Sequence, residues 1–262
     1  MQIPNEIKSI INEFSHLDEI QAITIGGSVS TGKADDKSDF DIYVYLDRSL
    51  EQNVRRDILT NFCKTMEIEN RYWEQEDNVT LHNRTNVDII YRYLGSFIRE
   101  IADVVESGNA RNGYTTCLWH NLLTAEIFFD REGELKKAKD RFTIPYPQIL
   151  KKNIINRNMN LLTDTLVSYD KQIEKSIYRN DLVNLNNRIT AFLDSYFDII
   201  FALNELQHPG EKRIMEICKE KCEKLPNDFK ENIDRLFSSL SNEPKSVSKN
   251  ITHIIKELKS II

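Results

Sequence analysis

The part of the chain that most constrains its fold lies between Ile23 and Asp47, where two segments of strand composition flank a glycine-rich turn and a polar loop. The first segment ends in a Gly-Gly-Ser sequence. Glycine leaves no side chain in the way, so backbone N–H groups can approach a ligand closely. The serine then adds a hydroxyl at the expected start of a short helix, where anions are favoured. The sequence therefore predicts a phosphate-binding turn made of Gly26, Gly27 and Ser28.

A pair of carboxylates follows in the second segment, DFDIYVYL, at Asp39 and Asp41. Residues two apart in a strand point to the same face of a sheet. Two carboxylates side by side repel each other unless a cation lies between them, and oxygen ligands favour magnesium. A phosphate-binding turn beside a dicarboxylate metal site is what phosphoryl or nucleotidyl transfer requires.

The spacing of these elements resembles a known signature. An apolar residue, Gly-Gly-Ser, ten residues and then Asp39-Phe40-Asp41 are similar to the motif of the nucleotidyltransferase superfamily of the DNA polymerase beta type. That superfamily includes the antibiotic and the minimal nucleotidyltransferases, and its members carry a third carboxylate on a later strand. The matching residue is Asp88 in the segment NVDIIYRYL. The resemblance implies that Asp88 is a third metal ligand or a general base, and both roles stay open.

Two later segments, TAEIFFDREGEL and FALNELQHPGEKR, resemble a group of uncharacterised bacterial nucleotidyltransferases with a helical second half. This resemblance implies that Lys212 reaches the nucleotide phosphates. The other interpretation is a helix end, a Pro-Gly turn and a new helix start. Lys33 is a candidate contact to the triphosphate, and a flexible surface lysine is the more common role for a residue in such a loop.

The superfamily resemblance implies a magnesium-dependent enzyme, with two metal ions, that transfers AMP from ATP or another nucleotide to a small-molecule hydroxyl. An aminoglycoside or lincosamide is the acceptor that the resemblance suggests. The net charge of −6 argues against extended nucleic acid as a partner. No apolar run is long enough to span a membrane, and four irregularly spaced cysteines favour a reduced, cytoplasmic protein. The sequence predicts no oligomeric state.

Two other classes of function fit the same residues. One is a regulatory or toxin–antitoxin nucleotidyltransferase that modifies a protein partner. The other is a nucleotide-binding module without catalysis, which the presence of all three aspartates disfavours. Glu74 and Glu76 are alternative general bases on what looks like a solvated acidic turn.

The pattern of apolar residues predicts an α+β fold, with a mixed sheet and flanking helices over residues 1–110 and an all-helical bundle over 111–262 that forms a substrate cleft. We expect a helix through 58–66, a short strand at 71–73, no strand after residue 113 and one long helix from 147 to about 178. Cys218 and Cys222, four apart, are expected to pack in a core, and His120 is expected to be structural.

Overall fold

The computed structural model describes residues 3–27 and 39–262. They form two compact units, one of Met1–Ala102 with Asn121–Ile144 and one of Asp103–His120 with Pro145–Ile262. The boundary predicted near residue 110 stays a prediction. The structure adds that the segment Asn121–Ile144 packs with the first unit.

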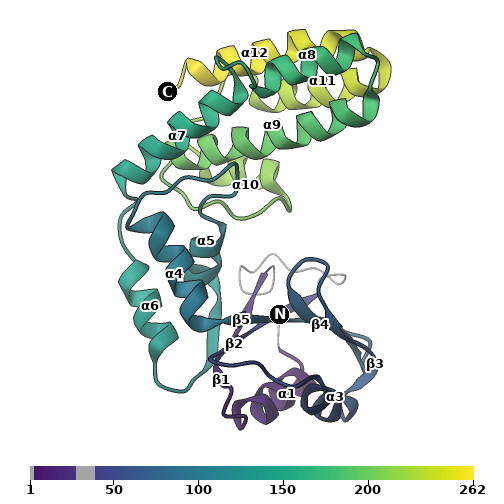
Figure 1. The fold of residues 1–262 in the computed structure, drawn as a ribbon, viewed down its shortest axis with the longest axis vertical. Helices are drawn as coiled ribbons and strands as arrows, with labels where there is room; N and C mark the ends of the chain where they lie inside the picture. Colours follow the sequence, from purple (N-terminus) through teal and green to yellow (C-terminus); the bar gives the residue numbers. More distant parts are fainter. Residues whose placement is uncertain (1–2, 28–38) are drawn as a thin grey trace. The chain divides into compact units, whose positions relative to one another are not determined.

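The first unit is built on a six-stranded sheet of order β3-β4-β5-β2-β1-β6 (Figure 1). Strands β2 and β5 pair in parallel, and the other neighbours are antiparallel, so the sheet is mixed as predicted. Three helices of the unit are α1, α3 and α6. The bounds are β1 Ile20–Gly26, β2 Phe40–Leu46, β3 Cys63–Asn70, β4 Gln75–Leu81, β5 Asn86–Tyr93, β6 Glu126–Asp130, α1 Asn5–Ser15, α3 Gln52–Thr60 and α6 Glu134–Phe142.

Helices α1 and α3 cover one face of the sheet (Figure 1). The buried stripe of α1 has helical spacing, with Ile7, Ile10, Ile11 and Phe14 packing against the strands. Alternate residues of β2 and β5, such as Ile42 and Ile89, point into this core. The residues between them, which include Asp41 and Asp88, therefore occupy the opposite face.

A buried ion pair joins α3 to β4 on the helix-covered face. Arg55 is fully buried, and its Nη1 donates to Asp77 Oδ1 at 2.6 Å. The Glu69 N–H and the Tyr91 hydroxyl also donate to the Asp77 carboxylate, each at 2.8 Å. Arg55 further pairs with Glu69 and lies over the Tyr91 ring, 4.7 Å from its centroid. This network fixes the position of β4, whose other face bears candidate site residues.

The second unit is largely helical, as the fold prediction required. Its longest helix, α9, begins where the Asp181 carboxylate accepts from the Asn184 N–H at 3.0 Å. Aromatic residues of α9 then pack against the surrounding helices in one core. The unit contains α7 Gln148–Leu162, α8 Tyr169–Tyr178, α9 Leu182–Leu203, α10 Ile214–Lys221, α11 Phe229–Asn242, the 3-10 turn η1 Pro244–Ser246 and α12 Val247–Lys259. Two helices, α4 Leu94–Val105 and α5 Cys117–Thr124, contribute residues to both units.

Asp198 is a buried carboxyl in α9 that holds the loop before α5. It accepts from the Thr115 N–H at 3.0 Å, from the Thr115 hydroxyl at 2.6 Å and from Asn158 Nδ2 at 3.1 Å. Burial raises the pKa of Asp198 to about 6 from an ordinary value of 3.8, although these donors act in the opposite direction. The folded protein therefore binds a proton here more readily than the unfolded chain.

A pH dependence of stability follows from this raised pKa. The contribution of Asp198 to the free energy of unfolding is full below about pH 4 and is lost as pH rises through about 6. The loss amounts to about 3 kcal/mol at most. In denaturant titrations over this range, we expect the unfolding free energy of the wild type to fall relative to that of Asp198→Asn as pH rises. A difference that rises with pH would contradict the account.

Four local predictions are wrong. The aromatic segment 71–73 is a turn between β3 and β4, because Tyr72 and Trp73 are 86% and 89% exposed and bury nothing. Helix α3 ends at Thr60 and strand β3 begins at Cys63, so residues 63–66 are strand and not helix. A strand, β6, is present after residue 113, where none was expected, because its backbone pairs with the edge of β1. The long helix is divided into α7 and α8, because Thr163 is extended and Asp164 has a φ of +70°.

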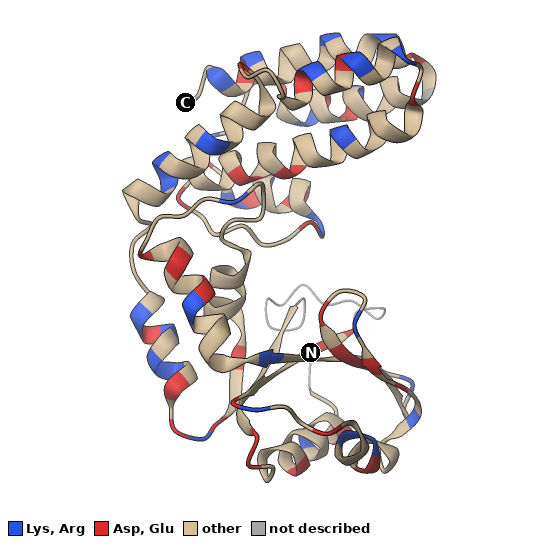
Figure 2. Ribbon diagram, viewed as in Figure 1, with Lys and Arg blue, Asp and Glu red and all other residues tan. Residues whose placement is uncertain are grey.

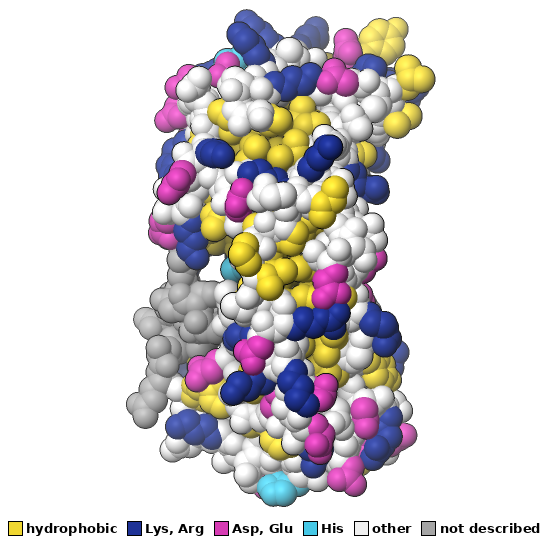
Figure 3. All heavy atoms as spheres, turned by 90° about the vertical axis from the view of Figure 1, so that its left-hand side faces the viewer, with side chains coloured by type: hydrophobic (Ala, Val, Ile, Leu, Met, Phe, Trp, Pro, Cys, Tyr) yellow, Lys and Arg dark blue, Asp and Glu magenta, His cyan; other side chains and the backbone are white. Residues whose placement is uncertain are grey.

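None of the helices in the part of the chain that the structure describes is long and apolar enough to cross a membrane. On the face drawn in Figure 3, basic and acidic side chains are interspersed.

Candidate functional site

Four polar or flexible positions lie in one row across the open face of the sheet. Gly26 on β1 pairs with Asp41 on β2, Asp41 pairs with Asp88 on β5, and Asp88 pairs with Asn78 on β4. Directly paired residues of neighbouring strands present their side chains on the same face. The sheet therefore brings Asp41 and Asp88, which are 47 residues apart in the sequence, next to each other at the end of the glycine turn.

Gly27 closely approaches Asp41. A Cβ atom at Gly27 would lie 1.8 Å from Asp41 Oδ2, and the Gly27 φ of +67° lies in the left-handed region that favours glycine. The backbone of the turn is thus packed directly on one of the predicted metal ligands. Gly26 is similarly restricted, because a Cβ there would lie 2.6 Å from the Tyr43 ring.

This contact predicts that Gly27→Ala displaces the Asp41 carboxylate. Gly133 offers a matched control, since its φ is +69° but a Cβ there would meet nothing within 4 Å. Both alanine variants are expected to lose ~1 kcal/mol or more of unfolding free energy from backbone strain. Only Gly27→Ala should also weaken magnesium–triphosphate binding, by at least ~10-fold in a calorimetric titration. Equal binding by the two variants would contradict a role for the Gly27–Asp41 contact.

Asp88 is held by an amide that sequence reasoning did not identify. Asn78 Nδ2 donates to Asp88 Oδ1 at 2.8 Å. Asn78 has no motif around it, and only the register of β4 against β5 shows its position. Glu76, two residues before it, is on the same face and 9% exposed, and burial together with the Asp88 charge raises the pKa of Glu76. Glu76 is therefore a strand residue beside the site, and the expectation that it lies on a solvated turn is wrong.

Arg92 of β5 lies on the open face of the sheet, next to this row. Its guanidinium donates to both oxygens of Glu74, at 2.6 and 2.7 Å, and to Asn121 Oδ1 at 2.8 Å. It also lies over the Tyr43 ring, 4.4 Å from the centroid. Glu74 is thus paired with a cation and is a weaker candidate for a general base than a free carboxylate. Figure 2 shows the acidic positions near the hairpin of β3 and β4.

The remaining predicted site residues have different settings. Asp39 is exposed and directly precedes β2. Ser28 and Lys33 lie outside the described residues. Lys212 is exposed in the turn before α10, in the second unit, and its predicted role stays a prediction. Within residues 3–27 and 39–262, no group of three or more His, Cys, Asp or Glu side chains is arranged to hold a metal. Two of the three predicted carboxylates, Asp41 and Asp88, are in register.

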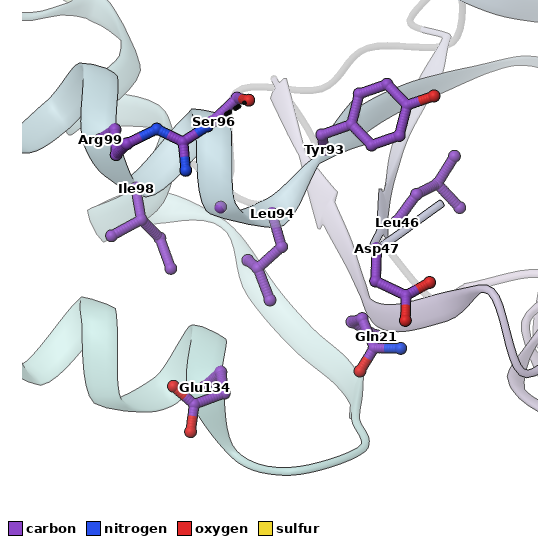
Figure 4. Close-up of a pocket in the computed structure, with 10 residues that line it drawn as sticks. Gln21, Leu46, Asp47, Tyr93, Leu94, Ser96, Ile98, Arg99 and Glu134 are labelled. Atoms are coloured by element: carbon purple, nitrogen blue, oxygen red, sulfur yellow. Dashed lines mark hydrogen bonds between the residues drawn. The ribbon is translucent and has the colours of Figure 1, made fainter. Parts of the chain in front are cut away.

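A pocket of about 510 Å³ lies at the other end of the same strands (Figure 4). Leu46 and Asp47, at the end of β2, and Tyr93, at the end of β5, contribute to it, together with residues of α4 and Glu134 of α6. It contains none of the predicted site residues. We therefore place the candidate site on the open sheet face and not in this pocket.

A cysteine and a histidine approach each other in the second unit, with Cys117 Sγ 3.5 Å from His208 Nδ1. Nδ1 accepts the Gly210 N–H at 3.1 Å, so it is occupied as an acceptor. Burial raises the pKa of Cys117 to about 12 and lowers that of His208 to about 3. A neutral thiol beside a neutral imidazole is not an activated nucleophile. This pair is structural.

Two further sequence-based interpretations concern buried groups. Burial lowers the pKa of His120 to about 4, with a further contribution from Lys221. Cys218 and Cys222 are free and buried, and Cys218 packs in the helical core. These settings agree with structural roles.

Residues 7–110 match the family of the nucleotidyltransferase domain. The chain carries a nucleotidyltransferase domain. This match includes the glycine turn, β2 and β5, and so all four residues of the row across the sheet. Residues 115–213, which include Asp198 and His208, match a domain of unknown function, DUF4037.

Two solved structures are similar over 98% of the chain. A nucleotidyltransferase-like protein from Exiguobacterium sibiricum 255-15 has 12% identity and a TM-score of 0.45, with 73% of that protein covered. An aminoglycoside 6-adenyltransferase from Bacillus subtilis has 10% identity and a TM-score of 0.30, with 91% covered. No curated protein matches the chain.

Proposed function

We propose that this protein is a metal-dependent nucleotidyltransferase that moves a nucleoside monophosphate, AMP from ATP in the first instance, onto a hydroxyl of a small-molecule acceptor. The observation that carries the proposal is the pairing of Asp41 with Asp88 beside the Gly27 turn, within a domain of this family.

The residues present fit a magnesium ion. Asp41 and Asp88 supply carboxylate oxygens from paired positions on one face, and oxygen ligands are what Mg²⁺ prefers. Asp39, directly before β2, is the third proposed ligand. Such an ion, or two, would offset negative charge on the triphosphate and on the oxygens that attack and leave.

The chain itself binds and orients the substrates. The backbone of Gly26 and Gly27 receives the phosphates, with Ser28, Lys33 and Lys212 as further proposed contacts. The acceptor oxygen attacks the α-phosphorus, the bond to the β-phosphate oxygen breaks, and pyrophosphate leaves. The hydroxyl proton passes to a base, and Asp88 is proposed for that role as the alternative to binding the metal. Asp88 Oδ1 is engaged by Asn78, while Oδ2 accepts no hydrogen bond from the described residues.

The proposal is tested by measuring pyrophosphate release from each of the four common triphosphates with Mg²⁺. Acceptors should include aminoglycosides, lincosamides and other polyhydroxylated small molecules. We expect release that depends on both Mg²⁺ and an acceptor. Labelling of proteins without any small acceptor would favour the protein-modifying class instead. Binding of a triphosphate without release under any condition would favour a non-catalytic module.

A further inference from the structure

A chain of hydrogen bonds links the turn between β3 and β4 to Asp88. The Tyr72 N–H donates to Asn70 Oδ1 at 3.0 Å. Asn70 Nδ2 donates to Asn78 Oδ1 at 2.9 Å, and Asn78 Nδ2 donates to Asp88 Oδ1 at 2.8 Å. Two side-chain amides thus lie in series between a backbone N–H and a carboxylate of the candidate site.

The groups at the two ends fix the orientation of both amides. A backbone N–H can only donate, so Asn70 must present its oxygen to Tyr72 and its nitrogen to Asn78. An ionised carboxylate can only accept, so Asn78 must present its nitrogen to Asp88. The two requirements agree, because each amide has one oxygen and one nitrogen to offer. Rotating either amide by 180° would place a donor against a donor at one of its contacts and an acceptor against an acceptor at the other.

We propose that Asn78 is a positioning residue that holds the Asp88 carboxylate in one orientation, and that Asn70 acts through Asn78. The inference rests on the proposed function, because Asp88 is a reacting group only in that account. The hydrogen bond at Oδ1 leaves Oδ2 to face the metal or the acceptor hydroxyl. Asn78 itself need not touch either substrate.

The same two strands provide a matched control. Thr80 Oγ1 lies 3.0 Å from Asn86 Oδ1, and Thr80 pairs with Asn86 in the register that pairs Asn78 with Asp88. Thr80→Val removes a hydrogen bond between the side chains of β4 and β5 without touching Asp88. A loss of activity that reflects weaker strand pairing alone should be equal in Asn78→Ala and Thr80→Val.

The kinetic test is a double-mutant cycle. We expect Asn78→Ala to lower kcat by ~10- to 100-fold with KM for the magnesium–triphosphate nearly unchanged, as for residues that orient metal ligands or catalytic groups. Asn70→Ala should cause a smaller loss. The double variant should equal Asn78→Ala alone, because the hydrogen-bonded path from Asn70 to Asp88 among the described residues runs through Asn78. Losses that add, or an Asn78→Ala enzyme no slower than Thr80→Val, would overturn the proposal.

A second measurement does not depend on turnover. The side-chain amide signals of Asn78 in a ¹⁵N spectrum can be assigned by their loss in Asn78→Ala. We expect their protons to exchange slowly with water in the wild type and in Thr80→Val, and faster in Asn70→Ala and Asp88→Ala. Fast exchange in the wild type would overturn the positioning proposal. If exchange is slow but no triphosphate is turned over, the proposed function fails while the hydrogen-bonded chain stands.

Discussion

Replacing Asp41 with asparagine is expected to lower kcat/KM for nucleotidyl transfer by at least ~1000-fold, on the scale of losing a central catalytic group. The substitution keeps the shape of the side chain and removes its charge. It also relieves repulsion from Asp88, the paired residue on β5, so the unfolding free energy should hold or rise slightly. Steady-state pyrophosphate release and denaturant titration measure the two effects separately.

Asp47 supplies the control for this substitution. It is an exposed carboxylate directly after β2, at the end of the strand remote from Asp41. Asp47→Asn changes the net charge by the same amount and should keep wild-type turnover. Equal activity of the two variants would remove Asp41 from the reaction.

Breaking the buried ion pair is expected to have the largest effect on stability. Arg55→Met leaves Asp77 buried without its cation, and Asp77→Leu leaves Arg55 buried with only the partly exposed Glu69 as its anion. Each substitution should lower the unfolding free energy by about 3–5 kcal/mol. The double variant should be more stable than either single variant, because it leaves less uncompensated charge in the core.

Urea titration of the two single variants and the double variant tests this expectation. The exposed ion pair of Lys137 and Glu134 gives a contrast, because removing it should leave the urea midpoint nearly unchanged. If the effects of Arg55→Met and Asp77→Leu simply add, the pair does not stabilise β4 in the way described.

The sequence predicted the candidate site where one short segment contained both a glycine turn and the carboxylates that follow it. Gly26, Gly27, Asp39 and Asp41 lie within 16 residues of the sequence, so their spacing alone predicted a shared site. The same reasoning did not predict the role of Asn78, which depends on β4 pairing with β5. It also did not reveal the parallel pairing of β2 and β5, which places Asp41 beside Asp88. These two strands are neighbours in the sheet although β3 and β4 lie between them in the sequence.

Errors in the fold came from aromatic and apolar residues whose burial could not be inferred locally. Trp73 has high strand propensity but lies exposed in a turn. Phe129 continues a helical spacing from α5 yet belongs to β6, because the free edge of β1 supplies backbone partners. At Phe129 the pairing with β1, and not side-chain type, decided the local structure.

The most direct test of the candidate site is a calorimetric titration of a magnesium–ATP analogue with a non-cleavable α–β linkage. The wild type, Asp41→Asn and Asp47→Asn should be compared in the same buffer. We expect saturable binding by the wild type and Asp47→Asn with the same affinity, and binding at least ~100-fold weaker in Asp41→Asn. Equal affinity in all three proteins, or wild-type affinity that persists in excess chelator, would contradict this expectation.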